Sequence, residues 1–367
     1  MDKKNKRKLP VWGRIIIISA LGLTVVFTGI YGLFSIRLGN INEFENAEII
    51  PPEKEYFEAD IPTGSAIAPE NVPAADSGQD LPDSVPAAVS PVSTGDIVWP
   101  SDGDILKNKN TINILLIGQD RRPGETRARS DSMMIGTINK EANTIKLTSL
   151  MRDLYVQIPG YSDNRINAAY AFGGMKLLDA TIQKNFQVQI DGNIEVDFDT
   201  FQEIINHIGG IDLTINGEEA EYLGTKGFPG LTAGEVHMDG ALALEYSRIR
   251  YIGRADYERT ERQKRILTTV YNNVRELGLA RILSLVKEML PMVKTDLSSG
   301  QIISCATYVV RMEVGDIDTY RIPADGAFSP AWIRQMAVLV PDLTANRKIL
   351  KEIIDGEQNG RDKFVEK

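Results

Sequence analysis

The sequence predicts an α/β fold: a mixed, partly antiparallel sheet flanked by helices in an α-β-α sandwich. One transmembrane helix and a disordered tether are expected to precede it. Three observations support this prediction. First, short polar segments separate several apolar strands. Second, strands and helices alternate after them. Third, an uncharged segment near the start of the chain is long enough to cross a bilayer.

The first three strands are expected at Thr111–Ile117, Ser132–Ile138 and Thr144–Leu150. The turn between the second and third strands is short, which favours antiparallel pairing. The loop between the first and second strands is longer and also predicts an antiparallel return. This meander brings the end of the first strand, the start of the second and the end of the third to one edge of the sheet.

Two acidic residues and several arginines collect at that edge. Asp120 ends the first strand, Asp131 begins the second, and Arg152 follows the third. The connecting loop adds further arginines, which are Arg121, Arg122, Arg127 and Arg129. A metal ion between the carboxylates, with a polyanion on the arginines, would relieve the repulsion between like charges. Mg²⁺ binds through one or two carboxylates and substrate phosphate oxygens. The alternative, which these residues leave open, is a solvated loop whose acidic and basic side chains pair with each other.

The rest of the domain is expected to alternate strands and helices. Strands are expected at Leu154–Ile158, Val188–Phe198, Ile211–Ile215 and Thr319–Ile322. Helices are expected at Met175–Phe186, Thr200–His207, Gly240–Tyr246, Tyr257–Leu279, Ile282–Met289, Ser298–Met312, Ser329–Met336 and Asn346–Ile354. The glycine pair at 173–174 is expected to break the helical pattern that begins after Arg165.

A second group of arginines follows the short helix. Arg248 and Arg250 are two residues apart, so an extended segment would place both on one face. Asp256 stands where a helix N-cap is expected, and Arg259 and Gln263 lie one turn apart on the next helix. Spacing alone favours a solvated face for the arginines of this helix, because glutamates lie nearby.

The chain ends predict the organisation of the protein. Residues 1–14 form a basic tail, residues 15–36 an uncharged span of bilayer length, and residues 37–110 an acidic and then Pro/Ala/Ser-rich tether. Basic residues flank the span on its N-terminal side, so we expect an uncleaved signal-anchor with the N-terminus in the cytoplasm. Residues 111–356 are expected to form the extracytoplasmic domain and residues 357–367 a polar tail.

Composition excludes several classes of protein. The 367-residue chain has a net charge of -9, which argues against nucleic acid as a partner. The single cysteine, Cys305, excludes an intrachain disulfide and is expected to lie in the core. Two histidines leave little room for a histidine-rich metal site.

Several motifs, taken in order, resemble those of the LytR–CpsA–Psr family. They are NILLIGQDRR, RSDSMMI, SLMRDLYVQIPG, RINAAYAFGG, VDFDTFQEIINHIGGIDL, ALEYSRIR and DYERTERQ. The resemblance covers Asn113 to about Leu267. No single motif is specific for the family, but their occurrence together in this order is.

The resemblance implies a membrane-bound phosphotransferase. Such enzymes move a glycopolymer of teichoic-acid or capsule type from a polyprenyl-pyrophosphate carrier to peptidoglycan, forming a phosphodiester. It implies Mg²⁺, with Mn²⁺ as the alternative, on Asp120 and Asp131. The matching residues include five assigned to catalysis, which are Arg152, Arg248, Arg250, Arg259 and Gln263. Four are assigned to the pyrophosphate, which are Arg121, Arg129, Arg165 and Asp256.

Some questions stay open at this point. The base that takes the proton of the acceptor hydroxyl could be Asp131 or Asp256. The lipid is expected in an apolar tunnel between sheet and helices. Ordinary core packing explains its candidate lining residues equally well; these are Ile205, Ile208, Leu242 and Ile266. A non-catalytic binder of polyprenyl pyrophosphate and a pyrophosphate hydrolase are the alternative functions.

Overall fold

The computed structural model describes residues 95, 97–101, 103–119, 129–250, 256–312 and 317–356. The predicted span at 15–36, most of the tether and the tail at 357–367 lie outside these residues. Among the helices that the structure describes, none is long and apolar enough to cross a membrane.

A central sheet of six strands organises the domain, with strand order β10-β3-β2-β1-β6-β9. Its strands are β1 (Thr111–Gln119), β2 (Ser130–Asn139), β3 (Thr144–Leu150), β6 (Gly192–Asp197), β9 (Lys294–Thr295) and β10 (Asp318–Ile322). β2 pairs antiparallel with both β1 and β3, which confirms the predicted meander. β1 and β6 are parallel, as are β3 and β10, so the sheet is mixed as predicted.

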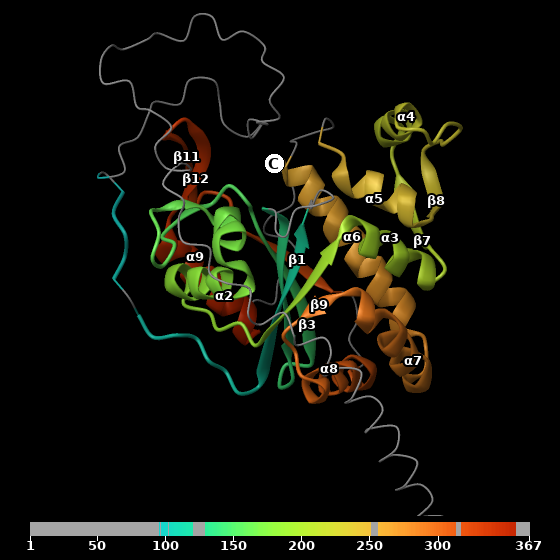
Figure 1. Cartoon of the computed structure of the whole chain (residues 1–367), viewed down its shortest axis with the longest axis horizontal. Coiled ribbons are helices and arrows are strands. Elements are labelled where there is room, and N and C mark those ends of the chain that lie inside the picture. The colour runs from blue at the N-terminus through green and yellow to red at the C-terminus, as the bar shows by residue number, and fades with distance from the viewer. Residues whose placement is uncertain are drawn as a thin grey trace, which may run out of the picture.

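Helices cover both faces of the sheet, which confirms the sandwich (Figure 1). The helices are α2 (Ile166–Phe186), α3 (Phe198–His207), α4 (Gly217–Thr225), α5 (Gly240–Arg248), α6 (Asp256–Arg275), α7 (Leu279–Met289), α8 (Ser299–Arg311) and α9 (Leu343–Asp355), with a 3-10 turn, η4, at Leu290–Met292. α2 and α9 lie on one side of the sheet, and α6, α7 and α8 lie on the other.

Three small sheets complete the fold. They consist of β4 (Tyr155–Val156) with β5 (Asn164–Arg165), β7 (Ile211–Ile215) with β8 (Gly234–Met238), and β11 (Phe328–Ile333) with β12 (Met336–Pro341). The helix predicted at Ser329–Met336 is wrong, because this segment is the β11–β12 hairpin. Its residues alternate between faces: Ala331 and Ile333 are buried, whereas Trp332 between them is half-buried.

The structure separates two main apolar cores. The larger lies between the sheet and α2 with α9, and its buried residues include Leu115, Ile135 and Leu178. The second lies among α3, α5, α6 and the β7–β8 hairpin, and includes Ile205 and Tyr246. The two cores lie on opposite sides of the sheet. The helices that carry Arg248 and Arg259 are therefore held by the second core and not by the larger one.

Two glycines fit close or unusual backbone geometry. Gly174 has φ 64° and ψ −153° inside α2, so the predicted helix break is a kink within one helix. Gly240 begins α5 against α3, where an added Cβ would lie 2.2 Å from the backbone oxygen of Gln202. This close approach fixes the start of the helix that ends at Arg248.

The folded part begins before the predicted boundary at Thr111. Trp99 stacks on Tyr155 with ring centroids 6.3 Å apart, and Leu106 pairs with Val188 in an isolated parallel bridge. The backbone oxygen of Ser101 accepts a hydrogen bond from Arg347 at 3.0 Å. The last residues of the predicted tether therefore pack on the domain.

Trp99→Ala should lower the free energy of unfolding by about 2 kcal/mol, because it removes a stacked, partly buried ring. Val98→Ala is the matched control, since Val98 is 91% exposed and should change stability by less than about 0.5 kcal/mol. Urea denaturation of the full chain measures both, and equal midpoints would contradict the packing of this segment.

A buried carboxyl next to the sheet should make stability depend on pH. Asp179 on α2 accepts a hydrogen bond from the Asn193 side chain at 2.8 Å. Burial raises the pKa of Asp179 to about 7; the bond from Asn193 opposes the shift, and nearby Asp296 adds to it. The folded state then binds this proton more tightly than the unfolded chain. The resulting stability is full below about pH 4 and is lost as the pH rises through about 7.

Asp179→Asn removes this proton binding. We compare the free energy of unfolding of the variant with that of the unmodified protein at each pH. This difference, variant minus unmodified, should be about 2 kcal/mol more favourable at pH 8 than at pH 5. Denaturation of both proteins at the two pH values measures this difference. The same relative stability at pH 5 and pH 8 would show that Asp179 ionises normally in the folded state.

Candidate functional site

A cavity of about 950 Å³ lies between the sheet and the layer of α3, α5 and α6. The sheet lines it with alternate residues, such as Leu116 and Gly118 on β1 and Ile194 and Val196 on β6. α6 contributes one helical face, on which Arg259, Gln263 and Ile266 follow at spacings of four and three residues. This cavity holds most of the described part of the predicted site.

The lining combines a basic part with an apolar part. The basic side chains are Arg129, Arg152, Arg165, Lys226, Arg248, Arg250 and Arg259. Three acidic residues accompany them, which are Asp131, Asp197 and Glu245. The apolar part includes Leu116, Ile194, Val196, Phe198, Phe201, Leu244, Ile266 and Leu267. Positive charge exceeds negative charge in the described lining, so the cavity can attract an anion that carries an apolar chain.

The structure therefore brings together seven of the predicted polar residues, which are Arg129, Arg152, Arg165, Arg248, Arg250, Arg259 and Gln263. Asp131 lies among them with its side chain 27% exposed. Asp120 and Arg121 lie outside the described residues, as do Arg122 and Arg127. Asp256 begins α6, as expected from its position at the helix start.

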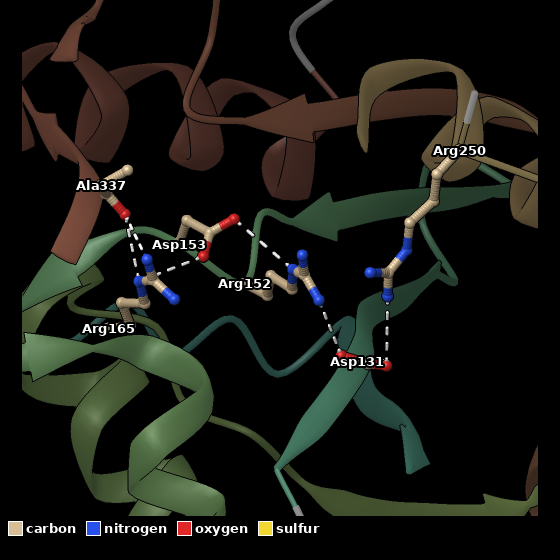
Figure 2. A network of polar contacts seen from close by, with 6 residues as sticks. All are labelled: Asp131, Arg152, Asp153, Arg165, Arg250 and Ala337. Carbon is tan, nitrogen blue, oxygen red and sulfur yellow. Dashed lines mark hydrogen bonds and ion pairs between the residues drawn. The ribbon is translucent and has the colours of Figure 1, made fainter. Parts of the chain in front are cut away.

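A chain of ion pairs runs along one wall of the cavity (Figure 2). Arg152 Nη1 lies 3.1 Å from Asp131 Oδ1, and Arg250 Nη2 lies 3.5 Å from Asp131 Oδ2. On the other side, Arg152 Nε lies 3.4 Å from Asp153 Oδ2. Arg165 Nε lies 3.2 Å from Asp153 Oδ1 and donates a hydrogen bond to the Ala337 carbonyl at 3.1 Å. Acidic and basic side chains therefore pair with each other, as the alternative of a solvated loop expects. The described pairs, however, lie beside a cavity and not in a solvated loop.

Asp153 is a residue that the sequence prediction missed. It follows Arg152 directly, its side chain is 2% exposed, and it lies between two arginines of the wall. A buried carboxylate with two guanidinium partners holds both in place and reduces their mutual repulsion. The sequence signal that could have indicated Asp153 is its position directly after Arg152, a predicted site residue.

Arg248 and Arg250 are placed differently from the prediction. Arg248 is the last residue of α5 rather than part of an extended segment, and its guanidinium lies 4.8 Å from the ring centroid of Phe198. Ile249 between them is buried, and its carbonyl accepts a hydrogen bond from Arg262 Nη1 at 3.2 Å. Both arginines nevertheless line the cavity.

The solvated face expected for Arg259, Arg262 and Arg265 of α6 is wrong for two of these three arginines. Arg259 is 5% exposed and lines the cavity, and Arg262 is 1% exposed in the interior. Arg262 Nε pairs with buried Glu219 Oε1 at 2.8 Å. Glu219 lies on α4, a helix that the sequence prediction omitted, so spacing within α6 could not reveal the pair.

The proposed apolar tunnel corresponds in part to the apolar side of the cavity. Ile266 lines the cavity and is also buried in the second core. Ile205 and Leu242 are buried in the second core and Ile208 packs against it, so core packing accounts for these three.

The described residues do not form a complete metal site. Among them, no group of three or more His, Cys, Asp or Glu side chains could hold an ion. Asp131 offers a carboxylate oxygen at the cavity beside several arginines, which fits the way Mg²⁺ is bound through a carboxylate and substrate oxygens. Its carboxylate also contacts Arg152 and Arg250, so an ion would have to share or replace those contacts.

Comparison with known proteins gives a consistent result. The model of the LytR_cpsA_psr family matches residues 83–353. A polyisoprenyl-teichoic acid–peptidoglycan teichoic acid transferase, TagU, of Bacillus cereus (strain AH820) is 35% identical over 170 residues, which is 46% of this chain and 54% of the relative. TagU of Bacillus anthracis (strain CDC 684 / NRRL 3495) is 33% identical over 205 residues, or 54% of this chain and 65% of the relative. The matches thus span less than two thirds of these relatives.

Solved structures share the fold. The crystal structure of B. subtilis TagV has a TM-score of 0.55 and 27% identity, covering 68% of this chain and 99% of that one. TagT with bound octaprenyl pyrophosphate lipid has a TM-score of 0.54 and 21% identity, covering 71% of this chain and all of that one.

Asp153→Asn should destabilise the protein by about 3 kcal/mol, because it leaves two largely buried guanidinium groups without their shared counter-charge. Inorganic pyrophosphate should raise the melting temperature of this variant more than that of the unmodified protein, since the anion replaces the missing charge. Thermal unfolding with and without pyrophosphate measures both effects.

The matched control is Asp325→Asn, which removes the partner of Arg321 from an exposed i,i+4 pair. It should change stability by less than about 1 kcal/mol and leave the response to pyrophosphate unchanged. An Asp153→Asn variant that behaves like this control would show that Asp153 does not hold the arginines.

Proposed function

The chain belongs to the LytR–CpsA–Psr family, and from this premise we propose that it is a phosphotransferase of the cell wall. It moves a glycopolymer of teichoic-acid or capsule type from a polyprenyl-pyrophosphate carrier to peptidoglycan and forms a phosphodiester link. The names of the TagU relatives, which are teichoic acid transferases, support this assignment.

The cavity carries the proposal, because its two parts match the two parts of the carrier. A polyprenyl pyrophosphate has a dianionic or more highly charged head and a long apolar tail. Six arginines and one lysine in the described lining suit the head, and the apolar side chains of β6, α3 and α6 suit the tail. A solvated cluster of ion pairs would need no apolar wall beside it.

The reaction exchanges one phosphorus–oxygen bond for another. The acceptor hydroxyl oxygen bonds to the phosphorus that carries the glycan, the bridging bond of the pyrophosphate breaks, and the polyprenyl phosphate leaves with the electron pair. Negative charge therefore grows on the leaving phosphate and on the equatorial oxygens. Preorganised arginines stabilise such charge most where water is excluded.

The arginines share this work. Arg152 and Arg250 both contact Asp131, and Arg248, Arg259 and Gln263 line the same cavity from α5 and α6. We assign these five to the reacting phosphates. We assign Arg129 and Arg165, which also line the cavity, to holding the pyrophosphate, together with Arg121 and Asp256.

Mg²⁺, or Mn²⁺ in its place, would be held by Asp131 and Asp120 and would supply further positive charge to the phosphate oxygens. The hydroxyl proton needs an acceptor, for which Asp131 and Asp256 remain the candidates. Asp131 lines the cavity, which supports its candidacy.

The location of the protein remains part of the proposal. The uncharged segment at 15–36 would anchor the chain in the cell membrane, with the domain outside. This arrangement would place the cavity close to a carrier lipid whose tail stays in the bilayer and to the peptidoglycan acceptor.

The test is transfer by the full chain with a polyprenyl-pyrophosphate oligosaccharide, Mg²⁺ and a peptidoglycan oligomer, followed by mass spectrometry. A glycan-phosphate–peptidoglycan adduct is expected. Arg152→Ala should lower its rate of formation about 100-fold or more, because it removes a charged donor from the reacting phosphates. Arg281→Ala is the control, since Arg281 lies on α7 with its side chain 55% exposed and should not affect the rate.

Other products would assign the alternative functions. Polyprenyl phosphate released without an adduct, at a rate unaffected by the acceptor, would identify a hydrolase. Lipid retained intact on the protein would identify a binder without turnover. Full activity of Arg152→Ala would refute the role of the arginine wall.

A further inference from the structure

The β11–β12 hairpin contributes a part of the cavity that the pyrophosphate does not explain. Trp332, Gln335, Met336 and Ala337 all line the cavity, and none of them carries charge. We propose that this corner is a subsite for a saccharide ring, formed by Trp332, Gln335 and Asn167. The proposal deepens the proposed function, since it names the part of the substrate that lies next to the phosphates.

The hairpin joins the arginine wall directly. Trp332 pairs with Ala337 across the two strands, and the Ala337 carbonyl accepts hydrogen bonds from Arg165 Nε at 3.1 Å and Nη2 at 2.7 Å. Figure 2 shows Arg165 between this carbonyl and Asp153. A group bound beside Trp332 would therefore be a neighbour of a phosphate held by Arg165.

The two faces of the hairpin differ in chemistry. Ala331, Ile333 and Val338 pack with Tyr155 in a small core on one face. Trp332 and Ala337 alternate with them and face the cavity, and the Trp332 side chain is only half-buried. A large aromatic ring left open toward a cavity offers an apolar surface for the C–H face of a pyranose, and its N–H can bond a hydroxyl.

The backbone of the hairpin tip is strained. Arg334 has φ 50° and Gln335 has φ 61°, so two adjacent non-glycine residues adopt the left-handed conformation. Asparagine and glycine are the usual residues of such turns, and other residues cost free energy there. Retaining Gln335 at the tip places an amide, which is both donor and acceptor, at the edge of the cavity.

Asn167 provides an independent sign of a missing ligand. It is 4% exposed and lines the cavity two residues after Arg165, and its backbone N–H donates to the Arg152 carbonyl at 3.4 Å. Its Oδ1 has no hydrogen-bond partner within the part of the chain that the structure describes. A buried amide oxygen without a partner is costly, and a sugar hydroxyl would satisfy it.

The sugar has two sources, which are the carrier's first sugar and the acceptor glycan. Calorimetric titration of the full chain distinguishes them with three probes: a polyprenyl pyrophosphate without sugar, the same lipid with a disaccharide, and a peptidoglycan oligosaccharide. We expect Trp332→Ala to weaken binding of one sugar-bearing probe roughly five- to tenfold and to leave the sugar-free lipid unchanged. Loss for the disaccharide lipid assigns the donor sugar, and loss for the peptidoglycan probe assigns the acceptor.

Two further variants separate binding from folding. Trp332→Phe keeps an aromatic face and should recover most of the affinity. Trp99→Ala removes the tryptophan on the other side of the hairpin; it should lower stability but leave all three affinities unchanged.

Equal affinities of Trp332→Ala and the unmodified protein for all three probes would overturn the subsite. Equal weakening for the lipid with and without sugar would also overturn it, because the ring would then support the phosphate site instead. None of these titrations requires turnover. A failure of the transfer assay with retained sugar selectivity would therefore refute the proposed reaction and leave the subsite standing.

Discussion

Repulsion between guanidinium groups is the constraint on which the site depends. Several arginines share one cavity, and the repulsion between their like charges costs free energy. Asp131 and Asp153 offset this cost by lying between arginines, so that charges alternate along the wall (Figure 2). The two acids differ in exposure. Asp153 is enclosed and its pairing is structural, whereas Asp131 opens to the cavity and can exchange partners when a ligand arrives.

The same alternation extends into the helical layer through residues that never reach the cavity. Arg262 and Glu219 form a buried pair, and Arg262 also bonds the carbonyl of Ile249. Because Ile249 lies between Arg248 and Arg250, one buried guanidinium fixes the backbone that carries two cavity arginines. Removing one member of a buried pair is strongly destabilising, so this support couples the shape of the site to the stability of the α4–α6 region.

Much of the fold and half of the wall could be predicted, because their signals are local. Apolar runs and short turns predict the β1–β3 meander. The meander in turn predicts that Arg152 and Asp131 lie close together. The burial of Arg259 and Arg262 could not be predicted from α6, since their environment comes from the sheet and from α4. The β11–β12 hairpin was mistaken for a helix because its turn, Arg334-Gln335, lacks the glycine or asparagine that marks such turns.

The order of the chain has a consequence for biogenesis. The cavity is lined from Leu116 to Ala337, and β10 completes one edge of the sheet only after residue 318. A chain that emerges from its N-terminus therefore displays its charged meander long before the wall that encloses it exists. The paired β-strands bridge large sequence separations, which slows folding and prolongs this open stage. The cavity is therefore complete only after nearly all of the polypeptide has been synthesised.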